Sequence, residues 1–165
     1  DGRAAGGQFA ALIDELSSPA FASAVGGKFG IDLSECATTI TVRKFCEKSD
    51  GNIHTDHPSK VITVLFYFNQ DWSNDAGRLR MLRSKSDIED FAAEVPPIGG
   101  TMLAFLRTDH SWHGHKTFVG ERRMLQLNFL RSDRLSRLRQ QIDRLGTRTM
   151  KKALRVFSPS DKGAP

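Results

Sequence analysis

The stretch VITVLFYF, residues 61–68, decides the fold class, because it is an unbroken run of β-branched and aromatic side chains. In an extended strand, alternate residues point to opposite faces. One face carries Ile62, Val64, Phe66 and Phe68, and the other carries Val61, Thr63, Leu65 and Tyr67. A strand with two usable faces is typical of one covered on both sides. The wholly apolar face suits helices packed outside, whereas the mixed face can line a polar cavity.

Similar runs lie on both sides of this stretch. They cover residues 38–46, 77–82, 101–106 and 123–130, with turn signals at 74–75, 96–97 and 99–100. Residues 122–129 divide as 61–68 does, with Leu125, Leu127 and Phe129 on one face and Arg122, Met124, Gln126 and Asn128 on the other. Many short strands separated by turns predict a mainly β fold of the jelly-roll type.

Helical periodicity is confined to the two ends of the chain. At the N-terminal end, residues 9–16 repeat apolar side chains at helical spacing, and a second short helix is expected from Pro19 to about Val25, stopping at Gly26-Gly27. From Asp133 onward, leucine and isoleucine recur on one helical face. We therefore expect a domain over residues 1–130 with two covering helices. A basic C-terminal helix and tail over 131–165 belongs to the same domain or is appended to it.

Composition and charge exclude several classes of protein. The chain has 165 residues, of which 39% are hydrophobic and 26% charged, as expected for one globular domain. No segment approaches the roughly 18 consecutive apolar residues of a membrane span, so no membrane partner is predicted. Cys36 and Cys46 allow at most one disulfide, which favours a cytoplasmic location.

The basic character of the chain is local. The net charge is +5, yet residues from 131 onward hold ten Lys/Arg and three Asp, a net charge of +7, which leaves −2 on the rest. A nucleic-acid partner would rest on this basic segment alone. The part of the chain that carries the candidate site is close to neutral, so we do not expect a nucleic-acid substrate.

One ordered set of residues has the chemistry of a metal site. His54-Thr55-Asp56 places an imidazole and a carboxylate on the same side of an extended segment. The histidine-rich segment 110–115 supplies candidates for a third ligand. Two histidines and one carboxylate leave further coordination positions open, as in non-haem Fe(II) oxygenases. Arg122 follows His113 by nine residues, and its guanidinium can bind a carboxylate through two hydrogen bonds.

The ordered set His54, Asp56, His113 and Arg122 resembles the Fe(II)/2-oxoglutarate-dependent dioxygenases, in particular the prolyl-4-hydroxylase-like branch. The resemblance runs from about Thr38 to Leu130. It includes further phrases of the family at residues 64–69, 71–72, 77–80 and 120–122. It implies a double-stranded β-helix, a cupin-like jelly roll, with flanking helices.

The resemblance also implies an activity. The chain would be an oxidoreductase that hydroxylates an organic substrate with O2, releasing succinate and CO2 from 2-oxoglutarate. His54, Asp56 and His113 would hold Fe(II), Arg122 would pair with the distal carboxylate of 2-oxoglutarate, and Tyr67 would add a hydrogen bond. Ascorbate is a candidate reductant. A prolyl or other protein residue is the closest analogy for the substrate, and a small molecule is the alternative.

The sequence departs from the family pattern in two places. One is the loop between the distal histidine and the arginine, where His115, Lys116, Thr117 and Phe118 replace the valine and proline often found there. The other is on the strand before His-x-Asp. Many relatives carry a tyrosine on the strand before His-x-Asp, where it holds the cosubstrate, and Phe45 is expected at that position here. Since phenylalanine has no hydroxyl, that hydrogen bond is predicted to be missing.

Several alternatives stay open. His115 competes with His113 as the third ligand, and the spacing to the arginine favours His113. Arg123 competes with Arg122, and alternation along the strand favours Arg122, because Arg123 shares a face with Leu125. A non-catalytic cupin-like module could use the same residues to bind a metal ion and an acidic ligand. The sequence predicts neither the substrate nor the oligomeric state.

Overall fold

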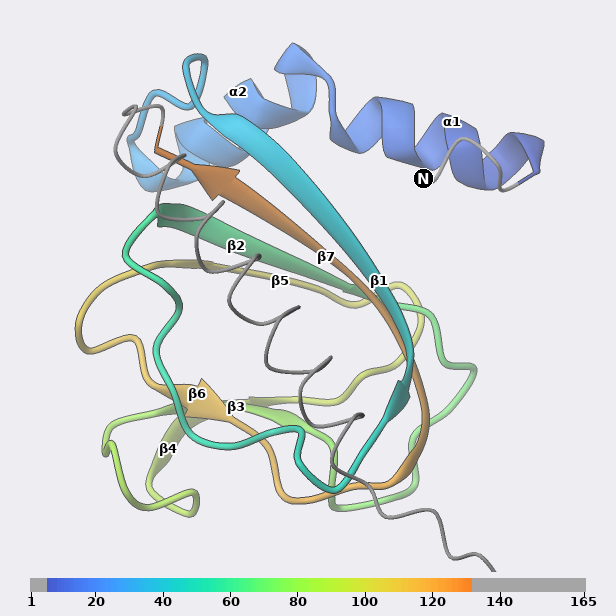
Figure 1. Ribbon diagram of the computed structural model, residues 1–165, viewed down its shortest axis with the longest axis vertical. Coiled ribbons are helices and arrows are strands. Elements are labelled where there is room, and N and C mark those ends of the chain that lie inside the picture. Colours follow the sequence, from blue (N-terminus) through green and yellow to red (C-terminus); the bar gives the residue numbers. More distant parts are fainter. Residues whose placement is uncertain (1–5, 132–165) are drawn as a thin grey trace, which may run out of the picture. The chain divides into compact units, whose positions relative to one another are not determined.

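The computed structural model describes residues 6–131 (Figure 1). The elements in chain order are α1 (Gly7–Leu16), α2 (Pro19–Phe29), β1 (Ala37–Cys46), β2 (Lys60–Tyr67), β3 (Leu79–Leu82), β4 (Phe91–Val95), β5 (Met102–Leu106), β6 (His113–Gly114) and β7 (Gly120–Leu130). The predicted C-terminal helix lies outside the described residues, and the domain division at residue 131 stays a prediction. Neither described helix is long and apolar enough to cross a membrane.

The strands form two antiparallel sheets. The larger sheet has the order β1-β7-β2-β5 and the smaller has the order β4-β3-β6. β7 lies inside the larger sheet, where Leu127 is opposite Ile40 of β1 and Val64 of β2. Figure 1 shows the two sheets facing each other, with α1 and α2 on the outer side of the larger one. The prediction of a mainly β domain with two N-terminal helices is thus confirmed.

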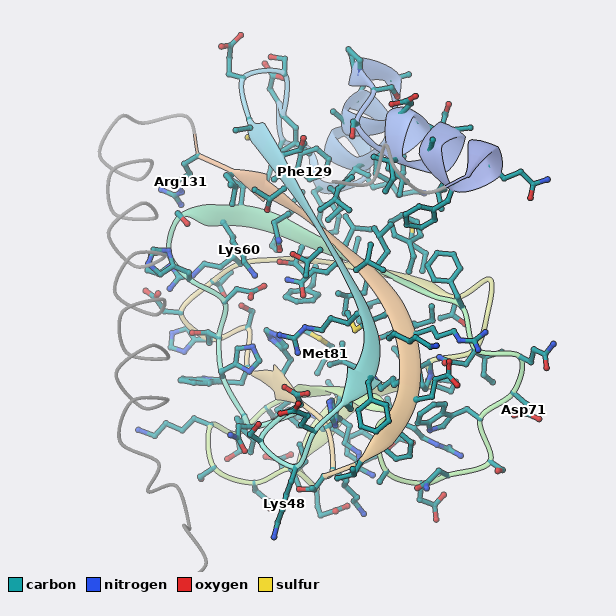
Figure 2. All side chains as sticks on the ribbon, turned by 45° about the vertical axis from the view of Figure 1, so that its right-hand side comes forward. Lys48, Lys60, Asp71, Met81, Phe129 and Arg131 are labelled. Carbon is teal, nitrogen blue, oxygen red and sulfur yellow. The ribbon has the colours of Figure 1, made fainter. Side chains whose placement is uncertain are left out.

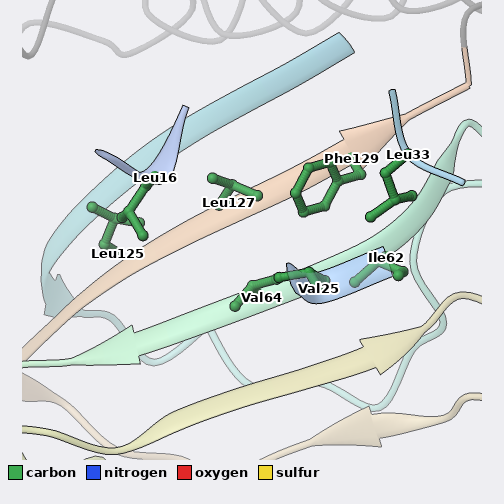
Figure 3. Packing of buried hydrophobic residues seen from close by; sticks show 8 residues of the cluster. All are labelled: Leu16, Val25, Leu33, Ile62, Val64, Leu125, Leu127 and Phe129. Atoms are coloured by element: carbon green, nitrogen blue, oxygen red, sulfur yellow. The ribbon is translucent and has the colours of Figure 1, made fainter. Parts of the chain in front are cut away.

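The outer face of the larger sheet carries the apolar core (Figure 3). The side chains packed there are Leu16, Val25, Leu33, Ile62, Val64, Leu125, Leu127 and Phe129. The five residues from β2 and β7 have no exposed surface. Full burial of each such side chain contributes about 1.5–3 kcal/mol, so this cluster fixes the helices on the sheet.

Helix α2 is longer than predicted. Its N-terminus is as expected, since the Ser18 hydroxyl accepts a hydrogen bond from the backbone of Phe21 at 3.1 Å and Pro19 takes the first helical position. The helix continues through Gly26-Gly27, however, and ends at Phe29, where Gly30 caps it in a left-handed conformation with φ of 65°. Gly30 therefore supplies the stop signal that the sequence analysis assigned to the earlier pair.

The inner face of the larger sheet is turned toward the smaller sheet. Leu65, Tyr67, Leu79, Phe105 and Met124 form a second, smaller apolar cluster there. Side chains from both sheets enter the space between them, as Figure 2 shows around the labelled Lys60 and Met81. Polar residues lie on the same face, including Thr63 and Asn128, which are 1% and 6% exposed. The predicted contrast between an apolar and a mixed face is confirmed on both strands.

Candidate functional site

Two segments far apart in sequence bring three candidate ligands together. His54 and His113 form an antiparallel bridge, in which each backbone N–H donates to the other residue's carbonyl, at 3.0 and 2.9 Å. Asp56 follows two residues after His54 and lies on the same side. One ligand atom from each of these three residues lies within 4.8 Å of the other two. The structure thus assembles the predicted set His54, Asp56 and His113.

Backbone carbonyls orient both imidazoles. The Nδ1 atom of His54 lies 2.7 Å from the carbonyl oxygen of Asn52, and that of His113 lies 3.0 Å from the carbonyl oxygen of Ser111. A carbonyl only accepts, so Nδ1 carries the proton and Nε2 keeps its lone pair. Burial lowers the pKa of His113, against a smaller opposing effect of the Ser111 carbonyl. The neutral imidazole, which is the metal-binding form, is therefore favoured.

The Asp56 carboxylate is buried and bound by protein donors at both oxygens. The Lys60 ammonium lies 2.5 Å from Oδ1, and the Thr63 hydroxyl donates to Oδ2 at 2.5 Å. Burial alone would raise the pKa of Asp56, but Lys60 and Thr63 outweigh it and hold the pKa below its ordinary value. Asp56 is consequently an ionised carboxylate at neutral pH.

A polar network ties this carboxylate to the sheet. The Thr63 hydroxyl also lies 3.2 Å from the side-chain oxygen of Asn128. That oxygen accepts from Gln126 at 2.9 Å, and the Asn128 amide donates to the Thr39 hydroxyl at 3.3 Å. These residues come from β1, β2 and β7, so three neighbouring strands hold the position of Thr63 and, through it, of Asp56.

Arg122 is buried, and no carboxylate of a described residue pairs with it. It is 3% exposed, and its Nε donates to the Gly77 carbonyl at 2.8 Å. Gly77 has φ of 76°, a conformation that favours glycine and aims this carbonyl at the guanidinium. Nη2 donates to the Tyr67 hydroxyl at 3.3 Å, and the guanidinium lies over the Tyr67 ring, 5.1 Å from its centroid. Since an isolated buried charge is costly, this arrangement is typical of an anion-binding site.

The competing arginine has a different environment. Arg123 is exposed, and its Nε donates to the Glu121 carboxylate at 2.6 Å. Alternation along β7 therefore directs Arg122 inward and Arg123 outward, as the sequence indicated.

Burial raises the pKa of the Tyr67 hydroxyl although Arg122 opposes this rise, so the phenol stays protonated and can donate.

A cavity of about 550 Å³ connects the ligand set with Arg122. His54, Asp56 and His113 line it together with Arg122, and so does His115. His115 is buried, but it is not part of the three-residue ligand cluster among the described residues.

Two features of the cavity wall differ from the sequence-based expectations. Phe45 is 56% exposed and does not face the cavity; the β1 residues that line it include Thr41 and Arg43. A register shift between Arg43 and Phe45 breaks the alternation along β1, so Phe45 is not on the cavity side as the family resemblance implied. Lys60 was not predicted at the site at all. The only signal for it was a basic residue four positions after Asp56, which has no special meaning outside a helix.

Comparison with known proteins gives one family and a structural neighbour. The model of the 2OG-Fe(II) oxygenase superfamily matches residues 41–131, more than half of the chain. A Pseudomonas putida prolyl-4-hydroxylase aligns with a TM-score of 0.50 and 19% identity, over 67% of this chain and 64% of that one. A hydroxypropylphosphonic acid epoxidase from S. wedmorenis aligns with a TM-score of 0.35 and 14% identity, over 58% and 44%. No curated protein sequence matches the chain.

Proposed function

The chain belongs to the 2OG-Fe(II) oxygenase superfamily, and we propose that it hydroxylates an organic substrate with O2 while 2-oxoglutarate is converted to succinate and CO2. Membership makes it an oxidoreductase that uses Fe(II) and 2-oxoglutarate. The observation that carries the proposal is the presence, in one cavity, of a three-donor cluster and a buried guanidinium with no carboxylate partner among the described residues. We also assign the two facing sheets to the double-stranded β-helix.

The donor set fits ferrous iron. Two imidazoles and one carboxylate bind three positions and leave others for a cosubstrate and O2. In this proposal His54 and His113 bind through Nε2, because their Nδ1 atoms are held by backbone carbonyls. Asp56 supplies the anionic ligand. Bound there, ferrous iron would supply the redox chemistry that activates O2.

Arg122 and Tyr67 are proposed to bind the distal carboxylate of 2-oxoglutarate. The guanidinium is a buried cation of the cavity with no carboxylate partner among residues 6–131, and the Tyr67 hydroxyl next to it is a neutral donor. A carboxylate placed here would gain charge-assisted hydrogen bonds shielded from water. Leu65, Leu79 and Met124 line the same cavity and would exclude water from the bound cosubstrate.

The substrate is proposed by analogy. The Pseudomonas putida neighbour is a prolyl-4-hydroxylase, so a prolyl residue in a protein or peptide is the first substrate class to test. This chain covers 64% of that hydroxylase, less than two thirds of its length. A cytoplasmic location and a requirement for ascorbate likewise stay predictions.

Anaerobic reconstitution tests the proposal. The full chain with Fe(II) and 2-oxoglutarate should develop a visible charge-transfer band, and addition of O2 should release succinate. Asp56→Ala should lose both signals, whereas Asp71→Ala, which removes an exposed carboxylate, should keep them. If Asp56→Ala lost the metal but the wild type, with metal and 2-oxoglutarate bound, formed no succinate, the chain would be a non-catalytic module instead. Metal bound equally well to Asp56→Ala would contradict the assigned site.

A further inference from the structure

Lys60 is a charged residue of the cavity to which the family chemistry assigns no task here. It begins β2, and its side chain is 17% exposed. Its ammonium lies 2.5 Å from Asp56 Oδ1, and this carboxylate is the one anion it contacts among the described residues. The same carboxylate is the anionic member of the proposed metal site. Lys60 and a metal ion therefore need the same partner.

The two Asp56 oxygens are not equally free to be released to a metal ion. Oδ2 accepts from Thr63, which is 1% exposed and tied to Asn128 on the rigid sheet. Oδ1 is held only by the end of the Lys60 side chain, whose four-carbon stem has several rotatable bonds. Oδ1 is thus the oxygen that can exchange its partner with the least change in the protein.

The charges along the cavity show what this exchange leaves behind. The cavity is lined by three cations, Arg43, Lys60 and Arg122, and by two carboxylates, Asp50 and Asp56. Arg43 and Asp50 pair at 3.2 Å. The charge of a divalent ion cancels that of the dianion 2-oxoglutarate. In this state Arg122 pairs with 2-oxoglutarate, and Asp56 pairs with the metal ion. Lys60 then remains as the cation without a partner in the loaded cavity.

We propose that Lys60 is an exchange residue that binds Asp56 in the metal-free site and, once a divalent ion takes Oδ1, binds an oxyanion of the substrate. This inference rests on the proposed function and narrows its substrate class. The substrate would carry a carboxylate or a phosphate close to the carbon that is hydroxylated; in a prolyl peptide, a neighbouring side chain would have to supply this group. A partly buried ammonium needs such a partner, because an unpaired charge there is costly.

The first test uses Mn(II) alone, titrated into the metal-free full chain. Lys60→Met removes the competing cation, so it should bind Mn(II) about tenfold more tightly than the wild type. Lys44→Met, which removes an exposed lysine side chain on β1, should leave the affinity unchanged. Lys60→Gln, which keeps a hydrogen-bond donor, replaces Lys60→Met if the latter does not fold. Weaker or equal Mn(II) binding in the Lys60 variant would overturn the exchange.

The second test uses inorganic phosphate and acetate as separate probes of the chain loaded with Mn(II) and 2-oxoglutarate. Paramagnetic relaxation of the 31P or 13C nucleus reports a probe close to Mn(II). Lys60→Met should weaken binding of the relaxing probe at least about fivefold, and Lys60→Arg should stay within about twofold of the wild type. Relaxation of phosphate alone identifies a phosphoryl group, and relaxation of acetate alone identifies a carboxylate.

The outcomes separate the two proposals. If the wild type fails to bind Mn(II) or 2-oxoglutarate, the proposed function itself is wrong. If it binds both and neither probe responds to Lys60→Met, only the role of Lys60 is wrong. A loss of 2-oxoglutarate affinity in Lys60→Met, with probe binding unchanged, would place the ammonium on the cosubstrate and would also overturn the inference.

Discussion

The two faces of β2 and β7 share a backbone and are both buried, but one is apolar and the other is polar. Toward the helices, Ile62, Val64, Leu125 and Leu127 are completely buried among apolar neighbours. Toward the smaller sheet, residues one position away are polar or charged and almost as deeply buried, among them Thr63, Arg122 and Asn128. Burial is therefore not what distinguishes them. Burial of the apolar outer face stabilises the fold. This stabilisation offsets the cost of removing the polar groups of the inner face from water.

The polar groups of the inner face differ in whether the protein itself supplies all their partners. Both Asp56 oxygens accept hydrogen bonds, from Lys60 and Thr63, and the Asn128 side-chain oxygen accepts from Gln126. Arg122 has hydrogen-bond acceptors but no anion among the described residues. The polar network is thus closed at the metal-ligand end and open at the arginine end, as expected if an anionic ligand completes it.

Truncation on the outer face should give the largest effect. Leu127→Ala removes a side chain with no exposed surface and should lower the free energy of unfolding by about 3 kcal/mol, because it leaves a cavity in the core. Urea denaturation measures this loss. Mn(II) affinity of the folded variant should equal that of the wild type. Equal losses of stability and metal affinity would show that the two faces are not independent.

Replacement of Arg122 should have the opposite result, a large loss of ligand affinity with little change in stability. Arg122→Met should weaken 2-oxoglutarate binding about 100-fold, since charge-assisted hydrogen bonds are lost, and should change stability by less than about 1 kcal/mol. Calorimetric titration of the Mn(II)-loaded chain provides the affinity. Arg123→Met, on the same strand but exposed and paired with Glu121, is the matched control and should bind as the wild type does. A large loss of stability with unchanged 2-oxoglutarate affinity would make Arg122 a structural residue.

A smaller effect is expected at Thr63, which orients a proposed metal ligand without binding the metal. Thr63→Val keeps the shape of the side chain but removes the hydroxyl that donates to Asp56 Oδ2. Mn(II) affinity should fall about tenfold, as is common when a group that orients a ligand is lost. Thr117→Val, at an exposed loop position, should have no effect. Unchanged affinity in Thr63→Val would mean that Asp56 is positioned without the network.

The smallest effect concerns pH. Burial lowers the pKa of His115 below its ordinary value of 6.5, against a smaller effect of the Lys116 carbonyl. His115 therefore binds a proton more readily in the unfolded chain than in the folded chain. As a result, the free energy of unfolding falls as pH drops below about 6.5. The contribution of this group is less than about 1.4 kcal/mol per pH unit. His115→Gln should flatten that slope in denaturation curves between about pH 6.5 and 5. An identical slope in the variant would contradict the assignment.

The long elements could be predicted from the sequence because each carries its own periodic signal. Residues 61–68 and 122–129 alternate over enough positions to define both faces, and this alternation directs Arg122 inward. The ligand set His54, Asp56 and His113 is identified by its order along the chain together with Arg122, through the family resemblance. The buried position of Arg122 and the exposed position of Arg123 could be predicted from strand alternation alone. These features depend on local sequence, which is what such patterns report.

Other features arise only from tertiary contacts. β4, with the sequence FAAEV, contains alanine and glutamate, which are poor strand formers, and is held by its pairing with β3. β6 has two residues and exists because His113 pairs with Met81 on one side and His54 on the other. The outward position of Phe45 follows from a register shift, and the position of Lys60 follows from the path of the loop before β2.

The account's central claim is that one cavity holds a metal ion at the donor cluster and a dicarboxylate at Arg122. A crystal structure of the full chain with Mn(II) and 2-oxoglutarate tests it most directly. The account predicts Mn(II) bound by His54, Asp56 and His113, with the distal carboxylate of 2-oxoglutarate on the Arg122 guanidinium and the Tyr67 hydroxyl. Mn(II) bound elsewhere, or 2-oxoglutarate bound without contact to Arg122, would contradict it.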